Sequence, residues 1–230
     1  MLEFKDNPKE LMQAFDRFLS VYFGARQIEY KPDLNKIASY NIPQPLKDIY
    51  SFIGKYSNRQ GTFGQQDTLT ISSRHNTYTH KGELAIVYEY AGVWTCFTET
   101  QGEDPPVWIK ERRWYDGYPQ RRFVHDSLSQ FLVAFCLQEA FIDSKYSQQI
   151  GNCSAKIKSE EILTAIEQEG YDVSLLWQGY YMSNAVWDKK PSISHSYYVV
   201  EDAILIWGSS CATNYKNANR LITSIQSRFK

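Results

Sequence analysis

The chain has 230 residues, of which 43% are hydrophobic, 15% aromatic and 22% charged. This composition predicts one large or two small globular domains and excludes a disordered, collagen-like or coiled-coil chain. The 25 Lys and Arg residues nearly balance the 26 Asp and Glu residues, so the formal net charge of -1 provides no overall attraction to nucleic acid or to an anionic membrane.

Two helices are expected at the start of the chain. Asn7 as N-cap and Pro8 as the first helical residue precede apolar residues at three- and four-residue spacing, which continue to Gly24. The dipeptides at 42–45 contain two prolines and predict the start of a second helix, which we expect to end at Gly54. Each helix should bury one apolar face against a hydrophobic core.

The next part of the chain has the pattern of an antiparallel sheet. β-Branched and aromatic residues predict strands at 84–90 and 93–98, joined by a tight turn, and a third strand at 107–109. A further short strand is expected at 68–71, within a polar segment. Ser127, followed three residues later by a glutamine, predicts a capping box and a helix that runs to about residue 141.

A second unit follows a polar connector. We expect a helix that ends at Gly170, strands at 173–182 and 197–207, and a last helix with Leu221 and Phe229 on one face. Runs of like elements predict an α+β fold, mainly an antiparallel sheet flanked by helices, rather than alternating βαβ units. The expected domains are 1–146 and a C-terminal α/β extension at 147–230 that packs on the first.

The sequence offers little support for catalysis or for a cofactor. It contains no phosphate-binding glycine motif, no HExxH motif and no CxxC pair, so we expect no metal or cofactor. The four cysteines are widely spaced, which is typical of reduced thiols in a cytoplasmic protein, and no signal peptide or membrane span is expected. A cysteine-dependent hydrolase, using Cys96 with His125 or using Cys136, remains an alternative, although the flanking apolar residues favour buried and inert thiols.

The most unusual segment is 110–122, in which five positive and two negative charges alternate with three aromatic residues. This pattern is typical of a single-stranded nucleic-acid groove. It is equally typical of a protein-binding hot spot, because Trp, Tyr and Arg contribute most of the energy of many interfaces. The structural alternative is a solvated hairpin in which arginine side chains lie over aromatic rings. The neutral net charge makes nucleic acid the less favoured partner.

Four short motifs in order resemble the SUKH superfamily, which includes the Smi/Knr cell-wall assembly regulators of fungi and many bacterial immunity proteins. They lie at 42–54, 82–94, 104–108 and 127–132. The second keeps the Glu, Gly and Val of the family pattern at Glu89, Gly92 and Val93 but replaces the Asn-Gln pair between them, and Ile42 stands in place of the family's Leu. The resemblance covers about residues 30–145, and the remaining residues match no family motif.

The resemblance implies a SUKH-like, non-enzymatic binding domain that neutralises a cognate toxin, frequently a nuclease, in the bacterial cytoplasm. A binder of such a toxin would present carboxylates and aromatic side chains, since complementary charge speeds association and buried aromatic anchors slow release. The candidate contact residues are Glu89, Glu103, Asp104, Trp108, Trp114 and Tyr115. Neither the toxin nor the oligomeric state follows from the sequence.

Overall fold

The computed structural model of the chain describes residues 6–23, 34–39, 41–56, 68–69, 79–80, 82–111, 121–142, 147–149, 159–170, 173–179, 195–200, 204–207 and 212–214. It has helices and two antiparallel sheets, so the predicted α+β class is confirmed.

The first helix, α1 (Pro8–Phe23), begins as its sequence predicts. The side-chain Oδ1 of Asn7 accepts hydrogen bonds from the backbone N–H groups of Lys9 and Glu10, at 3.0 and 3.2 Å. These bonds satisfy two donors that the first turn of a helix leaves without an intrahelical partner. Asn7 is therefore the N-cap, and Pro8 occupies the first helical position, where no N–H is needed.

The second predicted helix is α3 (Gln44–Tyr56), and a short helix that we did not predict, α2 (Leu34–Ser39), precedes it. The predicted end at Gly54 is wrong by two residues. Tyr56, which is 5% exposed, anchors the last turn because its hydroxyl lies 2.5 Å from Oδ1 and 3.0 Å from the carbonyl oxygen of Asp16 on α1. Lys55 Nζ adds an ion pair to the same carboxylate at 2.8 Å. These contacts outweigh the weak helix propensity of glycine.

The first sheet is antiparallel throughout. Its strands pair in the order β1-β3-β4-β5-β6, and β2 also pairs with β3. The strands are β1 (Thr68–Leu69), β2 (Thr79–His80), β3 (Glu83–Tyr88), β4 (Trp94–Glu99), β5 (Val107–Glu111) and β6 (Arg121–His125). The predicted hairpin and third strand are confirmed, whereas β6 was not predicted because its two arginines give it no apolar alternation.

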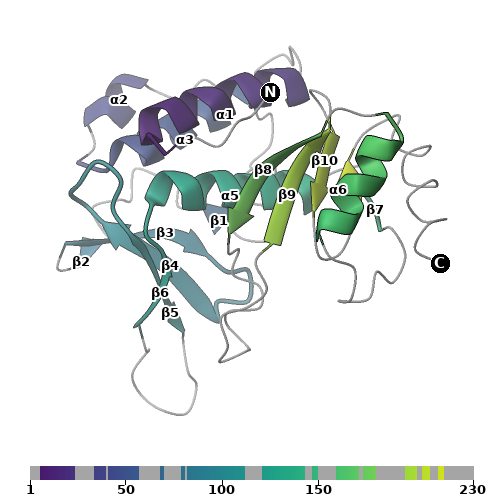
Figure 1. Cartoon of the computed structure of the whole chain (residues 1–230). Coiled ribbons are helices and arrows are strands. Elements are labelled where there is room, and N and C mark those ends of the chain that lie inside the picture. Colours follow the sequence, from purple (N-terminus) through teal and green to yellow (C-terminus); the bar gives the residue numbers. More distant parts are fainter. Residues whose placement is uncertain are drawn as a thin grey trace.

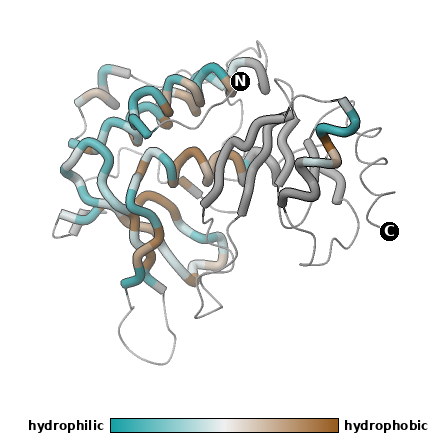
Figure 2. Tube along the Cα trace, viewed as in Figure 1, coloured by the Kyte–Doolittle hydropathy of each residue, from teal (hydrophilic) through white to brown (hydrophobic). Residues whose placement is uncertain are grey.

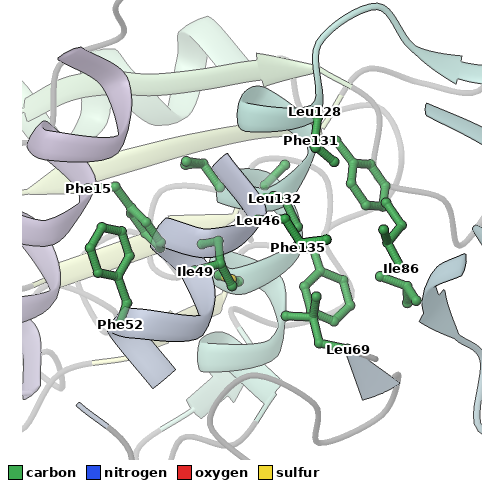
Figure 3. Packing of buried hydrophobic residues seen from close by; sticks show 14 of the residues in the cluster. Phe15, Leu46, Ile49, Phe52, Leu69, Ile86, Leu128, Phe131, Leu132 and Phe135 are labelled. Carbon is green, nitrogen blue, oxygen red and sulfur yellow. The ribbon is translucent and has the colours of Figure 1, made fainter. Parts of the chain in front are cut away.

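Helix α5 (Leu128–Ile142) lies between the α1–α3 layer and the first sheet (Figure 1). The helix is mostly apolar and has no distinct polar face, and much of it is brown in Figure 2; a helix of this kind is normally buried on most sides. Phe131, Leu132 and Phe135 are 0% exposed and meet side chains from α3 and from the sheet, such as Leu46 and Ile86 (Figure 3). The core of the molecule is therefore built around α5.

A second antiparallel sheet is formed by later residues, in the order β7-β11-β10-β9-β8. Its strands are β7 (Ser147–Gln149), β8 (Val173–Gly179), β9 (His195–Val200), β10 (Ile204–Trp207) and β11 (Ala212–Asn214). Helix α6 (Ser159–Gln168) contacts β8 and ends just before Gly170, whose φ of 82° is accessible mainly to glycine.

The second unit has more strands than the sequence pattern predicts. The predicted strand at 197–207 is two strands, β9 and β10, which pair with each other, and β7 and β11 were not predicted. The predicted last helix, with Leu221 and Phe229, lies outside the described residues. The domain boundary between residues 146 and 147 stays a prediction. In the part of the chain that the structure describes, none of the helices combines the length and the apolar composition needed to cross a bilayer.

Candidate protein-interaction surface

The two faces of the first sheet differ in character because side chains alternate along each strand. On β4 and β5, Cys96, Val107 and Ile109 are at most 1% exposed and belong to the core cluster. The residues that alternate with these along each strand point to the opposite side of the sheet and are only half buried. We call this side the outer face and define it by Phe97, Trp108, Lys110, Arg121 and Phe123.

Three aromatic residues form a continuous row across the outer face. The strand register places Phe97 of β4 opposite Trp108 of β5, and Trp108 opposite Phe123 of β6. Phe123 is 62% exposed, an unusual position for a phenylalanine. Directly opposed side chains on one sheet face lie close together, so the register places three aromatic side chains next to one another on the outer face.

Two cations lie over this aromatic row. Lys110 Nζ is 4.5 Å from the ring centroid of Phe97, and Arg121 Cζ is 3.7 Å from that of Trp108. Both distances are within the range of cation–π attraction. The carboxylate of Glu83 binds both cations: Oε2 pairs with Lys110, and Oε1 lies 3.0 Å from Arg121 Nη1. Glu83 therefore fixes the two cationic side chains over the rings.

The same contacts account for part of the basic segment 110–122. Lys110 and Arg121 share one carboxylate, and Arg121 stacks on Trp108 as the structural interpretation of the segment predicts. Arg122 pairs with Ile109 in the register and therefore lies on the opposite side of the sheet from the outer face. Burial lowers its pKa. The described cations of the segment are thus engaged within the fold, which reduces their ability to contact phosphates.

Asp104 has a structural role at the start of α5. Its carboxylate accepts hydrogen bonds from Ser127 Oγ at 2.5 Å, from the backbone N–H of Ser129 at 2.6 Å and from Ser129 Oγ at 2.9 Å. A carboxylate at this position also interacts favourably with the positive end of the helix dipole. Asp104 therefore joins the β4–β5 turn to the first turn of α5, a role that the sequence analysis did not recognise.

The predicted capping box at Ser127 is formed in one direction. Ser127 Oγ accepts a hydrogen bond from the backbone N–H of Gln130 at 3.2 Å, as expected for an N-cap. The backbone N–H of Ser127 donates instead to Nδ1 of His125, at 3.0 Å. Nδ1 also lies 3.1 Å from Oδ1 of Asp126, so these two contacts favour opposite protonation states of this nitrogen. Burial lowers the pKa of His125, against the opposing effect of Asp126 and Asp104.

The other predicted contact residues lie apart from one another. Glu89 closes the β3–β4 turn, where its Oε2 accepts a hydrogen bond from the backbone N–H of Val93 at 2.9 Å. Glu103 is exposed in the β4–β5 turn, at the opposite end of the sheet, and Trp108 lies between these turns on the outer face. Trp114 and Tyr115, in the connection from β5 to β6, are outside the described residues.

The two described cysteines, Cys96 and Cys136, are buried and form no disulfide. Burial raises the pKa of Cys136 well above its ordinary value, and the nearby Glu139 raises it further, so the thiol stays protonated. Cys96 lies opposite Ile109 on the inner side of β4, two strands away from His125 on β6. Within the described ranges, no group of three His, Cys, Asp or Glu side chains is arranged to hold a metal ion.

Of the aromatic row, only Trp108 was predicted from the sequence as a contact residue, and Phe97 and Phe123 were missed. Alternation within each strand was the available signal, but the register between strands brings the three rings together, and register is difficult to read from sequence. A scan of protein-family models and searches of curated proteins and solved structures all find no match to this chain.

Proposed function

We propose that this chain is a protein-binding domain and that the outer face of the first sheet is its contact surface. The observation that carries this proposal is the aromatic row, with Phe123 62% exposed and with Lys110 and Arg121 held over the neighbouring rings. Exposed aromatic side chains beside ordered cations have the composition of an interface hot spot.

The preorganisation of this surface favours binding. A lysine or arginine that must be immobilised on association costs roughly 0.5–1.5 kcal/mol of conformational entropy. Here the Glu83 carboxylate and the two rings already restrict Lys110 and Arg121 in the free protein. A partner that contacts them therefore meets side chains that are largely ordered in advance.

We infer further that the domain is SUKH-like and acts as an immunity protein. The four motifs that resemble the family fall at the start of α3, on the β3–β4 hairpin, on the β4–β5 turn with β5, and at the start of α5. These elements contribute to one core, and Asp104 of the third motif binds Ser127 and Ser129 of the fourth. This mutual packing supports the interpretation of the four motifs as parts of one domain. The partner would be a cognate toxin, encoded nearby and met in the cytoplasm.

The test is co-expression with the toxins encoded immediately upstream of the gene for this chain. We expect one of them to co-purify with this protein and its toxicity to be relieved. Replacing Phe123 by Ala should weaken that complex at least about tenfold, as expected for an interface anchor. Tyr90, which is 86% exposed on the β3–β4 turn away from the aromatic row, is the matched control, and Tyr90→Ala should change affinity by less than about twofold. If no neighbouring toxin is bound, the immunity proposal fails.

Nucleic-acid binding predicts a different result. A protein that contacts several phosphates binds a single-stranded oligonucleotide at low salt and loses affinity steeply as salt is raised. We expect no such binding, because Glu83 and Glu99 offset the charges of Lys110 and Arg121 on the outer face and the net charge of -1 provides no wider basic surface for several phosphates. Salt-sensitive binding that is lost in Arg121→Ala but retained in Phe123→Ala would overturn the proposal of a protein partner.

A further inference from the structure

Strand β6 lies at the end of the first sheet. One of its edges pairs with β5, and no described strand pairs with the other. An unpaired edge exposes backbone N–H and C=O groups that can bond to an added strand. Which residues of β6 offer these groups follows from the hydrogen-bond pattern of the sheet.

The pattern can be traced from the β3–β4 hairpin. The backbone N–H of Thr100 donates to the carbonyl oxygen of Gly82 at 3.0 Å, and the N–H of Glu89 donates to that of Trp94 at 3.2 Å. In an antiparallel pair, bonded and non-bonded residue pairs alternate, and successive residues direct their backbone groups to opposite sides. Phe97 therefore directs its backbone groups away from β3 and towards β5.

Continuing across the sheet identifies the groups at the free edge. Phe97 is bonded to its partner Trp108, so the next residue of β5, Ile109, directs its backbone groups to Arg122 of β6. Arg121 and Phe123, on either side of Arg122, then direct their N–H and C=O groups to the unpaired edge. The residues that offer free backbone groups are also the two most exposed members of the outer face.

The side chains at these two positions define what an added strand must carry. In the cluster around Glu83, Arg121 uses Nη1 for the carboxylate, and its remaining guanidinium N–H groups can donate to an acidic group. Phe123 offers apolar surface to an aliphatic or aromatic group. Because Arg121 and Phe123 are two residues apart on one face, the matching residues of an added strand are also two apart.

We propose that β6 binds an extended segment of the partner protein as an additional strand, with an acidic residue beside Arg121 and an apolar residue beside Phe123. This inference rests on the proposed function and names the kind of segment that the partner presents. Backbone hydrogen bonds supply affinity, and the alternate side chains supply selectivity.

The first test uses nuclear magnetic resonance with synthetic peptides of alternating Thr and Ser that carry one Asp and one Leu two positions apart, in both orders. The control peptide has Asp and Leu adjacent, which places them on opposite faces of a strand. Near saturation, we expect amide exchange of Arg121 and Phe123 to slow about tenfold, with no change at Arg122, whose N–H is already bonded to β5. The control peptide should bind at least about threefold more weakly.

Two variants separate backbone from side-chain contacts. Phe123→Ala removes the ring and keeps the N–H, whereas Phe123→Pro removes both, at a position where β5 does not use the N–H. We expect the proline variant to bind the peptide about threefold to tenfold more weakly than the alanine variant, which corresponds to one lost hydrogen bond. Amide exchange in the unaltered protein tests strand addition at β6 independently of how well the proline variant folds.

Three results would overturn the strand-addition proposal: no binding of either peptide, binding without protection of the two amides, or occupation of the same edge by a second copy of this chain in solution. Each is distinguishable from failure of the proposed function. If Phe123→Ala weakens the toxin complex while the peptides leave the β6 amides unprotected, the outer face is the contact surface and strand addition is wrong.

Discussion

Replacing Asp104 by Ala should destabilise the protein more than any other change in the β4–β5 turn. The carboxylate accepts three hydrogen bonds, two from Ser129 and one from Ser127, at the N-terminus of the central helix. Hydrogen bonds to a charged group contribute about 1.5–3 kcal/mol each when removed singly, but these three share one carboxylate and are not additive. With the helix-dipole interaction included, we expect the free energy of unfolding to fall by about 3 kcal/mol.

Urea denaturation followed by circular dichroism measures this loss, which should move the midpoint by about 1 M or more. Asp104→Asn keeps one side-chain oxygen as an acceptor but loses the charge, so we expect it to lower the free energy of unfolding by about half as much as Asp104→Ala does. Glu103, the exposed neighbour in the same turn, is the control, and Glu103→Ala should change the free energy of unfolding by less than about 0.5 kcal/mol. Equal effects of the two alanine variants would refute the assignment of Asp104 to the helix terminus.

Burial holds the pKa of His125 below 6.5, so the unfolded chain takes up this proton first as the pH falls, and the free energy of unfolding should decrease below about pH 6.5. His125→Gln should lose this pH dependence. A variant whose stability has the same pH profile as the unaltered protein would contradict the prediction. Cys136, whose pKa is raised by burial, should resist alkylation until the chain unfolds, as peptide mapping by mass spectrometry would show, and fast labelling in the native state would revive the hydrolase hypothesis. Glu83→Gln should lower the free energy of unfolding by less than about 1 kcal/mol, since Lys110 and Arg121 are partly exposed. It should also weaken binding of the acidic peptides in a titration, because both cations lose the carboxylate that orders them; stronger binding would show that their charge matters more than their ordering.

The elements that were predicted correctly are those with a local signal. Asn7 and Pro8 identify the start of α1, and Ser127 identifies the start of α5, because capping depends on residues within one turn. The end of α3 was misplaced because Tyr56 is anchored by Asp16, a residue on another helix. Strand β6 was missed because it has no apolar alternation and its Arg121 is stabilised by residues on other strands.

The candidate surface shows the same division between local and distant signals. The segment 110–122 was recognised by its composition, and Trp108 was recognised as part of a strand. Pairing of Glu83 with two cations and alignment of Phe97 with Phe123 across β5 depend on the register of separate strands. A one-residue change in register would turn these side chains to the other face, so composition and spacing within one strand do not determine the surface.

Hydroxyl-radical footprinting of the complex with the neighbouring toxin tests the central claim most directly. The account predicts that Phe97, Trp108 and Phe123 become protected together when the partner binds, while Tyr90 on the β3–β4 turn keeps its reactivity. Protection confined to other parts of the chain, with the aromatic row as reactive in the complex as in the free protein, would contradict it.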